Sequence, residues 1–262
     1  MQSIDKFSLK KKTIFVVGGS GQIGYEVCKL FSELKGKVIN LDITKNKKQK
    51  KNVSFFKIDV ANSSNIEKNL KDAIKKYGCP NVFINCSYPY DSNWGQTSFK
   101  DVNMNTINSN IKLHLNSYIW LARLIAEQML IKKIRGSIIQ FGSTYGVVGQ
   151  ITDIYDGTHI KENMIYSAIK GGIINNSRQM SSHYGKFGIR VNTICPGGVL
   201  GYVAGQSNKI PEKFLKRYIS RTPLKRFAKA KEIAYATAFL SSDASSYITG
   251  TTFMVDGGWT AI

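Results

Sequence analysis

A tyrosine and a lysine four residues apart form the pattern with the clearest chemical use in this sequence. Tyr166 and Lys170 lie in the segment YSAIK, within a predicted helix, so both side chains face the same side. A tyrosine hydroxyl, with an ordinary pKa of about 10, is a poor acid–base catalyst near neutral pH, and a neighbouring ammonium group favours its phenolate form. The pair therefore predicts a general acid–base group in which Lys170 lowers the pKa of Tyr166.

The same spacing occurs twice, and position separates the two copies. Tyr25 and Lys29 follow a glycine-rich turn, where we expect a surface pair. The pair at 166 and 170 opens a helix after a predicted strand that ends just before Ser143. A hydroxyl at that strand end can donate to a substrate oxygen and stabilise developing negative charge. We therefore expect Ser143 to act with Tyr166 and Lys170.

The glycine-rich turn near the N-terminus has the spacing of a dinucleotide-binding motif. GxGxxG stands at 19, 21 and 24, between a predicted strand and a predicted helix, which is the context that the motif needs. Glycines allow the backbone to approach a pyrophosphate, and the helix N-terminus supplies free N–H groups. A turn that only joins two elements is the alternative. The cofactor-binding residues expected here are Gly18, Ser20, Gly21, Gln22, Ile23 and Gly24.

Asp42 indicates which dinucleotide is bound. It follows Gly24 by 18 residues, close to the offset of about 20 at which a carboxylate meets the adenosine ribose hydroxyls and repels a 2′-phosphate. The sequence therefore favours NAD over NADP. NADP stays open, because Lys45, Lys47 and Lys48 would neutralise a 2′-phosphate if their loop folded back.

The catalytic and cofactor-binding residues can come together at the carboxyl edge of a parallel sheet, where all the strands end. Short apolar runs alternate with helical patterns, as in repeated βαβ units. The predicted strands are 13–17, 37–41, 53–58, 81–85, 137–141, 189–194 and 252–255, and the predicted helices are 22–34, 63–77, 104–132, 164–184 and 230–240. The sequence therefore predicts an α/β Rossmann fold, a doubly wound parallel sheet of about seven strands with helices on both faces. We expect a single domain over residues 1–262, with a substrate-loop insertion at about 146–163.

Composition and charge exclude several other classes. The net charge of +20 is spread along the chain, so we expect no nucleic-acid binding. The four cysteines form no CxxC pair and no histidine stands at metal-ligand spacing, so we expect neither a metal site nor a disulfide framework. No apolar stretch is long enough for a signal peptide or a membrane span. We expect a cytoplasmic protein without a membrane partner.

Taken in order, these motifs resemble those of the short-chain dehydrogenase/reductase (SDR) family. The glycine turn, the serine, YxxxK, IRVN at 189–192, the proline–glycine pair at 196–197 and VDGG at 255–258 occur in the family's order, from about residue 12 onward. The resemblance implies an oxidoreductase that moves a hydride between a nicotinamide cofactor and a carbonyl or alcohol carbon. It implies acid–base catalysis by Tyr166, a pKa-lowering and ribose-binding role for Lys170, and substrate orientation by Ser143. Further cofactor contacts are implied for Asp59, Val60, Asn85, Pro196 and Gly197.

The chain departs from the family pattern at three places. Val17 and Gln22 replace a threonine and a glycine of the glycine motif, and Asn85-Cys86-Ser87 replaces NAG after the fourth strand. The relay asparagine of the long central helix aligns with His114. An imidazole can pass protons, so His114 is a candidate catalytic residue. A relay through Asn110 or Asn116, or a structural histidine at a subunit interface, stays open.

The segment between the serine and the tyrosine is longer than in most family members and predicts a polar wall. Its candidate wall residues are Asp153, Tyr155, Asp156, His159 and Lys161, joined after the fourth strand by Tyr88, Tyr90, Asp91 and Trp94. Such a wall favours a polar, sugar-like substrate. GSTYGVVG, YSAIKGGIIN and DGGWTAI also resemble a branch associated with flagellin modification and surface-sugar biosynthesis, although kinship of fold does not fix a substrate.

Two other functions are compatible with parts of the sequence. A 3-oxoacyl-carrier-protein reductase would use NADPH and dock an acidic carrier on a basic surface, but Asp42 and the polar insertion disfavour it. A non-catalytic dinucleotide-binding regulator is disfavoured by the intact catalytic residues.

The resemblance also implies a homodimer or homotetramer, formed through the helices predicted at 104–132 and 164–184. Ile111, Leu115, Ile119 and Ala122 recur at helical spacing, which predicts one buried face but leaves open whether it packs on the same chain or on a partner.

Overall fold

All seven strands of the structure form one parallel sheet. The computed structural model describes residues 3–90, 94, 96–201 and 210–262, and the strand order is β3-β2-β1-β4-β5-β6-β7. Their bounds are β1 (Thr13–Val17), β2 (Lys37–Asp42), β3 (Ser54–Lys57), β4 (Val82–Asn85), β5 (Ser137–Phe141), β6 (Arg190–Pro196) and β7 (Thr252–Val255). The chain runs outward from β1 to β3 and then crosses back to β4, so the order reverses between β1 and β4. Ligands of such sheets bind at this reversal, beyond the carboxyl ends of the strands.

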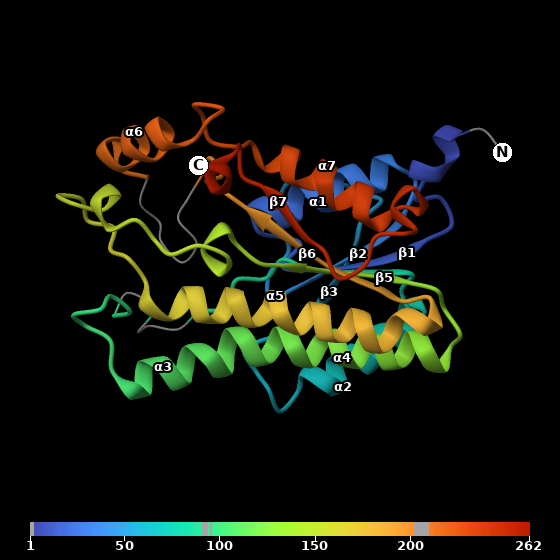
Figure 1. Cartoon of the computed structure of the whole chain (residues 1–262). Coiled ribbons are helices and arrows are strands. Elements are labelled where there is room, and N and C mark those ends of the chain that lie inside the picture. Colours follow the sequence, from blue (N-terminus) through green and yellow to red (C-terminus); the bar gives the residue numbers. More distant parts are fainter. Residues whose placement is uncertain (1–2, 91–93, 95, 202–209) are drawn as a thin grey trace.

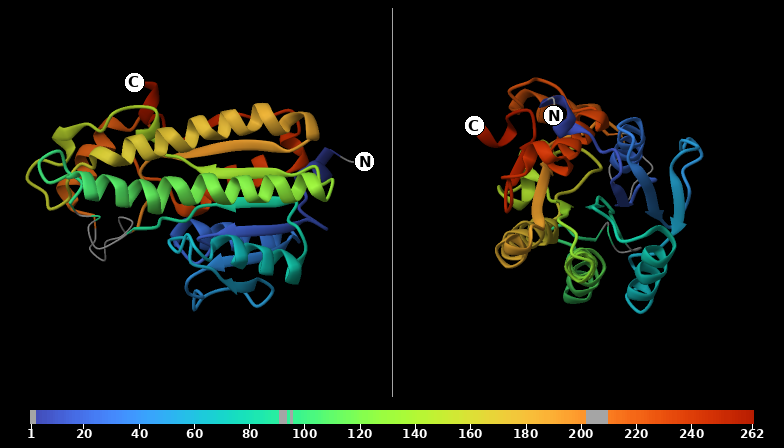
Figure 2. Two further views of the ribbon diagram at one scale, coloured as in Figure 1. Left: turned by 90° about the horizontal axis from the view of Figure 1, so that it is seen from below. Right: turned by 90° about the vertical axis from the view of Figure 1, so that its right-hand side faces the viewer.

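Helices cover both faces of the sheet (Figure 1). Three helices lie side by side on one face, and two that contact one another cover the other, as the right-hand view of Figure 2 shows. The first layer comprises α2 (Ile66–Tyr77), α4 (Asn116–Ile131) and α5 (Met164–Tyr184), and the second α1 (Gln22–Glu33) and α7 (Ala230–Ser241). The predicted Rossmann fold is therefore confirmed.

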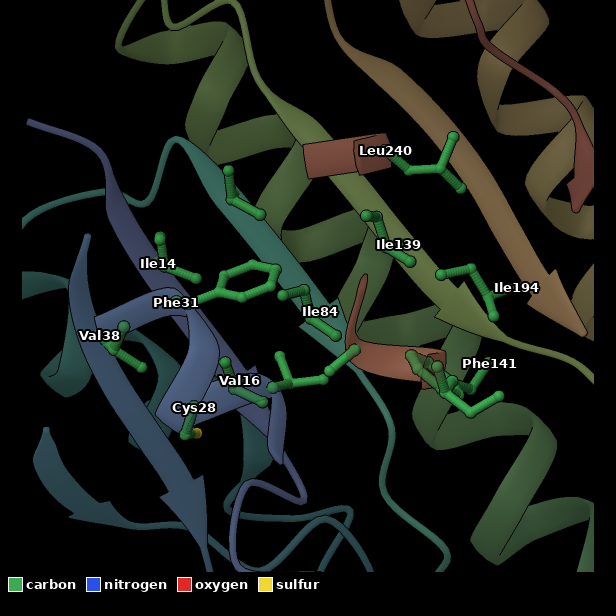
Figure 3. Close-up of a cluster of buried hydrophobic side chains, with 14 of the residues drawn as sticks. Ile14, Val16, Cys28, Phe31, Val38, Ile84, Ile139, Phe141, Ile194 and Leu240 are labelled. Carbon is green, nitrogen blue, oxygen red and sulfur yellow. The ribbon is translucent and has the colours of Figure 1, made fainter. Parts of the chain in front are cut away.

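Alternation along the strands separates two apolar layers. In β1, Ile14 and Val16 pack with Phe31 and Leu240 beneath the α1–α7 layer (Figure 3). The intervening residues of β1 pack against the opposite layer, in a cluster that includes Leu121 of α4. Successive side chains of a strand point to opposite faces, so a strand buried on both sides must be apolar throughout. This explains why TIFVV reads as a continuous apolar run.

The structure corrects the prediction at two elements, while the other predicted ends are met to within three residues. The helix predicted at 104–132 is divided into α3 (Met104–Asn110), a π-helical turn (Ile111–Leu115) and α4. A helix that the sequence reading missed, α6 (Glu212–Arg221), precedes α7. Short 3₁₀ turns occupy Ser3–Phe7, Thr144–Gly146, Thr152–Ile154, Gly185–Phe187, Asp243–Ser245 and Trp259–Ala261.

No helix among the described residues is both long enough and apolar enough to cross a membrane.

Candidate active site

The end of β5 and the start of α5 bring the predicted catalytic residues together. Asn163 caps α5, because its side-chain oxygen accepts a hydrogen bond from the Tyr166 amide at 2.9 Å. This cap places Tyr166 in the first turn of the helix and Lys170 one turn later. Ser143 follows β5; its Oγ accepts from the Tyr145 amide at 3.2 Å and is hydrogen-bonded to the Tyr166 hydroxyl.

The Lys170 ammonium group is buried behind this serine and tyrosine. Its Nζ donates to the carbonyl of Phe141 at 2.9 Å and lies 3.2 Å from Nε2 of His114. The ring of Tyr118 is centred 5.0 Å from the same nitrogen, and that of Tyr166 is centred 5.6 Å away. The lysine therefore lies between the catalytic tyrosine and the central helix.

Burial disfavours the charged forms of both Tyr166 and Lys170. It raises the pKa of Tyr166 to about 12, which the hydrogen bond from Ser143 offsets only in part, and it lowers the pKa of Lys170 to about 7. The predicted lowering of the Tyr166 pKa by Lys170 is therefore not found. The physical reason is that desolvation of the phenolate outweighs attraction to an ammonium that is itself only partly charged at neutral pH.

His114 lies inside the chain, in the π-helical turn. It is fully buried, and burial lowers its pKa well below the ordinary value. Asn110 is also buried but donates to the Thr106 carbonyl at 2.8 Å, whereas Asn116 is exposed. Of the three relay candidates, His114 is therefore the one that contacts Lys170. The alternative of an interface histidine is wrong, because the ring packs within this chain against Tyr88.

A cleft of about 1340 Å³ runs over the carboxyl ends of the strands. It is lined by nearly all the predicted cofactor residues: Gly18, Ser20, Gly21, Gln22, Ile23, Gly24, Asp42, Asp59, Val60, Tyr166, Lys170, Pro196 and Gly197. Asn85 is the exception. It is fully buried beneath the cleft, and its Oδ1 accepts from the Ser87 amide at 3.2 Å and from the Ser87 hydroxyl at 2.7 Å. It therefore supports the loop after β4 and does not line the cleft.

The glycine turn leaves backbone donors facing this cleft. Gly21 is the N-cap of α1, and because it has no side chain the first N–H groups of the helix stay open. Gly24 packs directly on the turn, since a Cβ at this position would overlap the Gly18 carbonyl. These features fit the pyrophosphate of a dinucleotide.

Asp42 lies at the adenosine end of the cleft and is held by backbone donors. Its Oδ2 accepts from the Ser20 amide at 2.9 Å and its Oδ1 from the Ile43 amide at 2.7 Å. A carboxylate has about four acceptor positions, so it can still accept ribose hydroxyls. Asn46 donates to the Ser20 carbonyl at 3.0 Å and ties the following loop to the turn. The lysines of this loop, at 45, 47 and 48, are exposed and do not line the cleft.

A second cavity, of about 390 Å³, opens beside Ser143 and Tyr166 and is more aromatic than predicted. Of the predicted wall, Tyr155, His159 and Lys161 line it, together with Tyr88 and Trp94. Tyr90 lines the cofactor cleft instead, and Asp91 lies outside the described residues.

The two aspartates that the insertion was predicted to place in the wall do not line this cavity. Asp153 lies 3.7 Å from Arg221 and the Asp156 carbonyl accepts from Arg217 at 2.6 Å, both on α6. Lys161, although it lines the cavity, pairs with Asp101 at 2.7 Å. The charged side chains of Asp153 and Lys161 therefore pair with neighbouring elements.

Further lining residues were missed by the sequence reading. Tyr145, Gln150, Phe214, Tyr218 and Phe227 are among the other residues that line the cavity. The amphipathic spacing of FLKRY in α6 was the available signal for two of them. The others lie in loops, where periodicity carries no information.

Among the described residues, no group of three or more histidine, cysteine, aspartate or glutamate side chains is arranged to hold a metal ion.

Known proteins resemble this chain over nearly its whole length. The model of the family described as enoyl-(acyl carrier protein) reductase matches residues 19–260. The post-translational flagellin modification protein A of Campylobacter coli is 31% identical over 265 residues, covering 96% of this chain and 99% of that protein. The 3-oxoacyl-[acyl-carrier-protein] reductase of Buchnera aphidicola is 30% identical, and the alignment covers 95% of this chain and 98% of that protein.

Among solved structures, a short chain dehydrogenase of Leptospira borgpetersenii with bound NAD+ has a TM-score of 0.86 at 27% identity, covering 99% of this chain and 96% of that chain. The resemblance inferred from the motifs is confirmed by the family match and by this agreement in fold. The chain therefore belongs to the short-chain dehydrogenase/reductase family of oxidoreductases, which use a nicotinamide dinucleotide.

Proposed function

We propose that this protein is an NAD-dependent oxidoreductase that acts on the carbonyl or alcohol group of a polar, sugar-like substrate in the cytoplasm. The observation that carries the proposal is the position of Ser143 and Tyr166, which line both the dinucleotide cleft and the aromatic cavity. A substrate carbon in that cavity would therefore meet a cofactor in the cleft beside a proton donor.

Each catalytic side chain has a separate role in this proposal. A bound nicotinamide supplies or accepts the hydride. In the direction of reduction, the Tyr166 hydroxyl donates a proton to the substrate oxygen, and the Ser143 hydroxyl donates a hydrogen bond to the same oxygen. A charged Lys170 would stabilise the phenolate that remains, and its side chain would hold the nicotinamide ribose. Oxidation uses the same contacts in reverse.

Preference for NAD follows from Asp42. Its carboxylate is fixed by two backbone amides, so it cannot easily turn away from a ribose 2′ position. A 2′-phosphate there would meet a negative charge in a partly buried place, which is unfavourable.

The lining of the cavity supports a substrate with both polar and apolar faces. Tyr88, Trp94 and Tyr155 line the cavity with aromatic rings, which suit the C–H face of a sugar, and Gln150 and Asn163 add polar side chains to the lining. The relationship to the flagellin modification protein supports the same class of substrate.

An NADPH-dependent 3-oxoacyl-carrier-protein reductase is the second candidate. The relative from Buchnera aphidicola and the net charge of +20, which suits an acidic carrier protein, favour it. Asp42 argues against it, so cofactor preference separates the two candidates.

The test is a titration of the protein with NADH and with NADPH, followed by fluorescence and thermal shift. We expect tighter binding of NADH, and we expect Asp42→Ala to remove that preference. Asp72→Ala, which removes an exposed carboxylate from α2, is the matched control and should leave both affinities unchanged. Tighter binding of NADPH would favour the acyl reductase, and binding of neither would contradict both candidates.

A further inference from the structure

Lys170 is a buried cation whose neighbours are mostly aromatic. Its side chain is 2% exposed, and Tyr118, Tyr166 and Tyr88 place their ring centroids 5.0, 5.6 and 5.8 Å from its Nζ. Ring faces attract a cation but do not replace the hydrogen bonds that it loses on burial. The charge on Lys170 therefore depends on the acceptors that reach its Nζ.

Two acceptors reach this nitrogen in the part of the chain that the structure describes. One is the Phe141 carbonyl at 2.9 Å, which belongs to the backbone of β5 and cannot be removed by substitution. The other is His114, whose Nε2 lies 3.2 Å away. When Lys170 carries its proton, the ammonium group only donates hydrogen bonds, so Nε2 then accepts in this contact. His114 is therefore the acceptor side chain of the lysine.

The surroundings of His114 keep its ring neutral and in place. The ring lies 5.0 Å from the Tyr88 ring and 5.3 Å from the Tyr118 ring, and the π-helical turn that carries it packs against α5. Burial and the nearby Lys170 both lower the pKa of His114. A neutral imidazole has a single N–H, so when Nε2 accepts, the proton lies on Nδ1, which has no hydrogen-bond partner among the described residues. Near neutral pH, His114 therefore offers a lone pair to the lysine.

We propose that His114 is a positioning residue that accepts a hydrogen bond from Lys170 through Nε2 and holds the lysine in its ammonium form beside Tyr166. A hydrogen bond to the charged form favours that form. The proton stays on Lys170 in this arrangement, so His114 acts through the lysine and does not itself transfer a proton to the substrate. The inference deepens the proposed function and rests on it for the role of Tyr166.

The other titratable side chains that face this pair are neutral near pH 7. Burial raises the pKa of each of them above its ordinary value. They are Cys86 and Tyr88 from the loop after β4, Tyr118 from α4, Tyr166 from α5 and Cys195 from β6. Lys170 is thus the member of this cluster whose charge changes near neutral pH.

The test follows the titration of Lys170 by NMR, with the protein labelled with carbon-13 at lysine Cε and the Lys170 signal assigned by its loss in Lys170→Arg. We expect a midpoint near 7 in the wild type. In His114→Phe, which keeps a buried ring but removes the acceptor, the midpoint should fall by about one pH unit or more, because a hydrogen bond to a charged group is lost. His114→Gln supplies an amide oxygen and should restore at least half of the shift.

Tyr184→Phe is the matched control. Tyr184 is a buried ring on α5, and the substitution removes the hydrogen bond that its hydroxyl donates to Glu127 at 2.6 Å. It should leave the Lys170 midpoint unchanged. An unchanged midpoint in folded His114→Phe would overturn the proposal, and His114→Leu gives the same test if the phenylalanine variant does not fold.

The titration needs no turnover, so its outcome is independent of whether NADH or NADPH binds. With a substrate in hand, the alkaline limb of the kcat/KM profile should move to lower pH by the same amount as the midpoint.

Discussion

At the scale of single residues, the site combines groups whose charged forms are disfavoured by burial. Tyr166 has its pKa raised to about 12 and Lys170 has its pKa lowered to about 7, both by desolvation. Neither change could be read from the YxxxK spacing, because the spacing fixes which side chains share a helix face but not how much solvent reaches them. Tyr166 can therefore give up its proton near neutral pH only when another group stabilises its phenolate.

The role of Tyr166 is tested by Tyr166→Phe. This substitution removes the proton donor and keeps the ring, so we expect kcat to fall by about 10² to 10⁴. Cofactor affinity should change little, because the backbone donors of the glycine turn and Asp42 are untouched. Steady-state kinetics and an NADH titration measure the two quantities, and a variant with full activity would refute the assigned mechanism.

At the scale of elements, the strands were predictable and the irregular segments were not. β1 is apolar on both faces because helices cover both sides of the sheet, and such runs are visible in a sequence. The π-helical turn at Ile111–Leu115 was missed, because one extra residue in a turn hardly alters a helical pattern of apolar residues. Asn85 was assigned to the cofactor, whereas its burial beneath Ser87 depends on how the loop after β4 folds.

The apolar positions of the central helix also became clear only in the structure. Ile111 and Leu115 pack against the core of their own chain, and Ala122 is buried in it. Ile119, the fourth position of the predicted face, is only half-buried and belongs to neither core cluster, so three of the four positions pack on the same chain.

The start of α5 provides a prediction at this scale. Asn163→Ala removes the helix cap that fixes the Tyr166 amide, and should lower the free energy of unfolding by about 1 kcal/mol and also reduce kcat. Asn103→Ala is the matched control, because Asn103 caps α3 through the same contact with the Thr106 amide at 3.0 Å. It should cost a similar amount of stability and leave kcat unchanged. Denaturant unfolding and kinetics of both variants measure this difference, and equal losses of kcat would contradict it.

At the scale of the whole molecule, α4 and α5 form a layer that carries large exposed apolar side chains. The two helices lie side by side in Figures 1 and 2. Trp120 is 39% exposed and Ile131 is 64% exposed on α4, and Phe187, just after α5, is 41% exposed. Large exposed apolar side chains on neighbouring helices favour association when they form a contiguous surface. We propose that this layer joins copies of the chain into a homodimer or homotetramer.

Light scattering after size-exclusion chromatography tests this proposal. We expect the wild type to elute as an oligomer and Trp120→Glu to shift it toward the monomer. Lys68→Glu changes a charge on α2, in the same layer of helices, and should leave the mass unchanged. A monomeric wild type would argue against the assembly.

The aromatic wall of the second cavity has a further consequence. Tyr155, Phe214, Tyr218 and Trp259 belong to an apolar cluster that is separate from the two that flank the sheet, and Tyr218 stacks on Trp259 with ring centroids 4.0 Å apart. Substitutions in separate clusters are close to additive in their effects on stability. The wall can thus diverge while the sheet and the dinucleotide cleft are conserved, and a loss of stability in the wall can be offset by a stabilising substitution in either of the two clusters that flank the sheet.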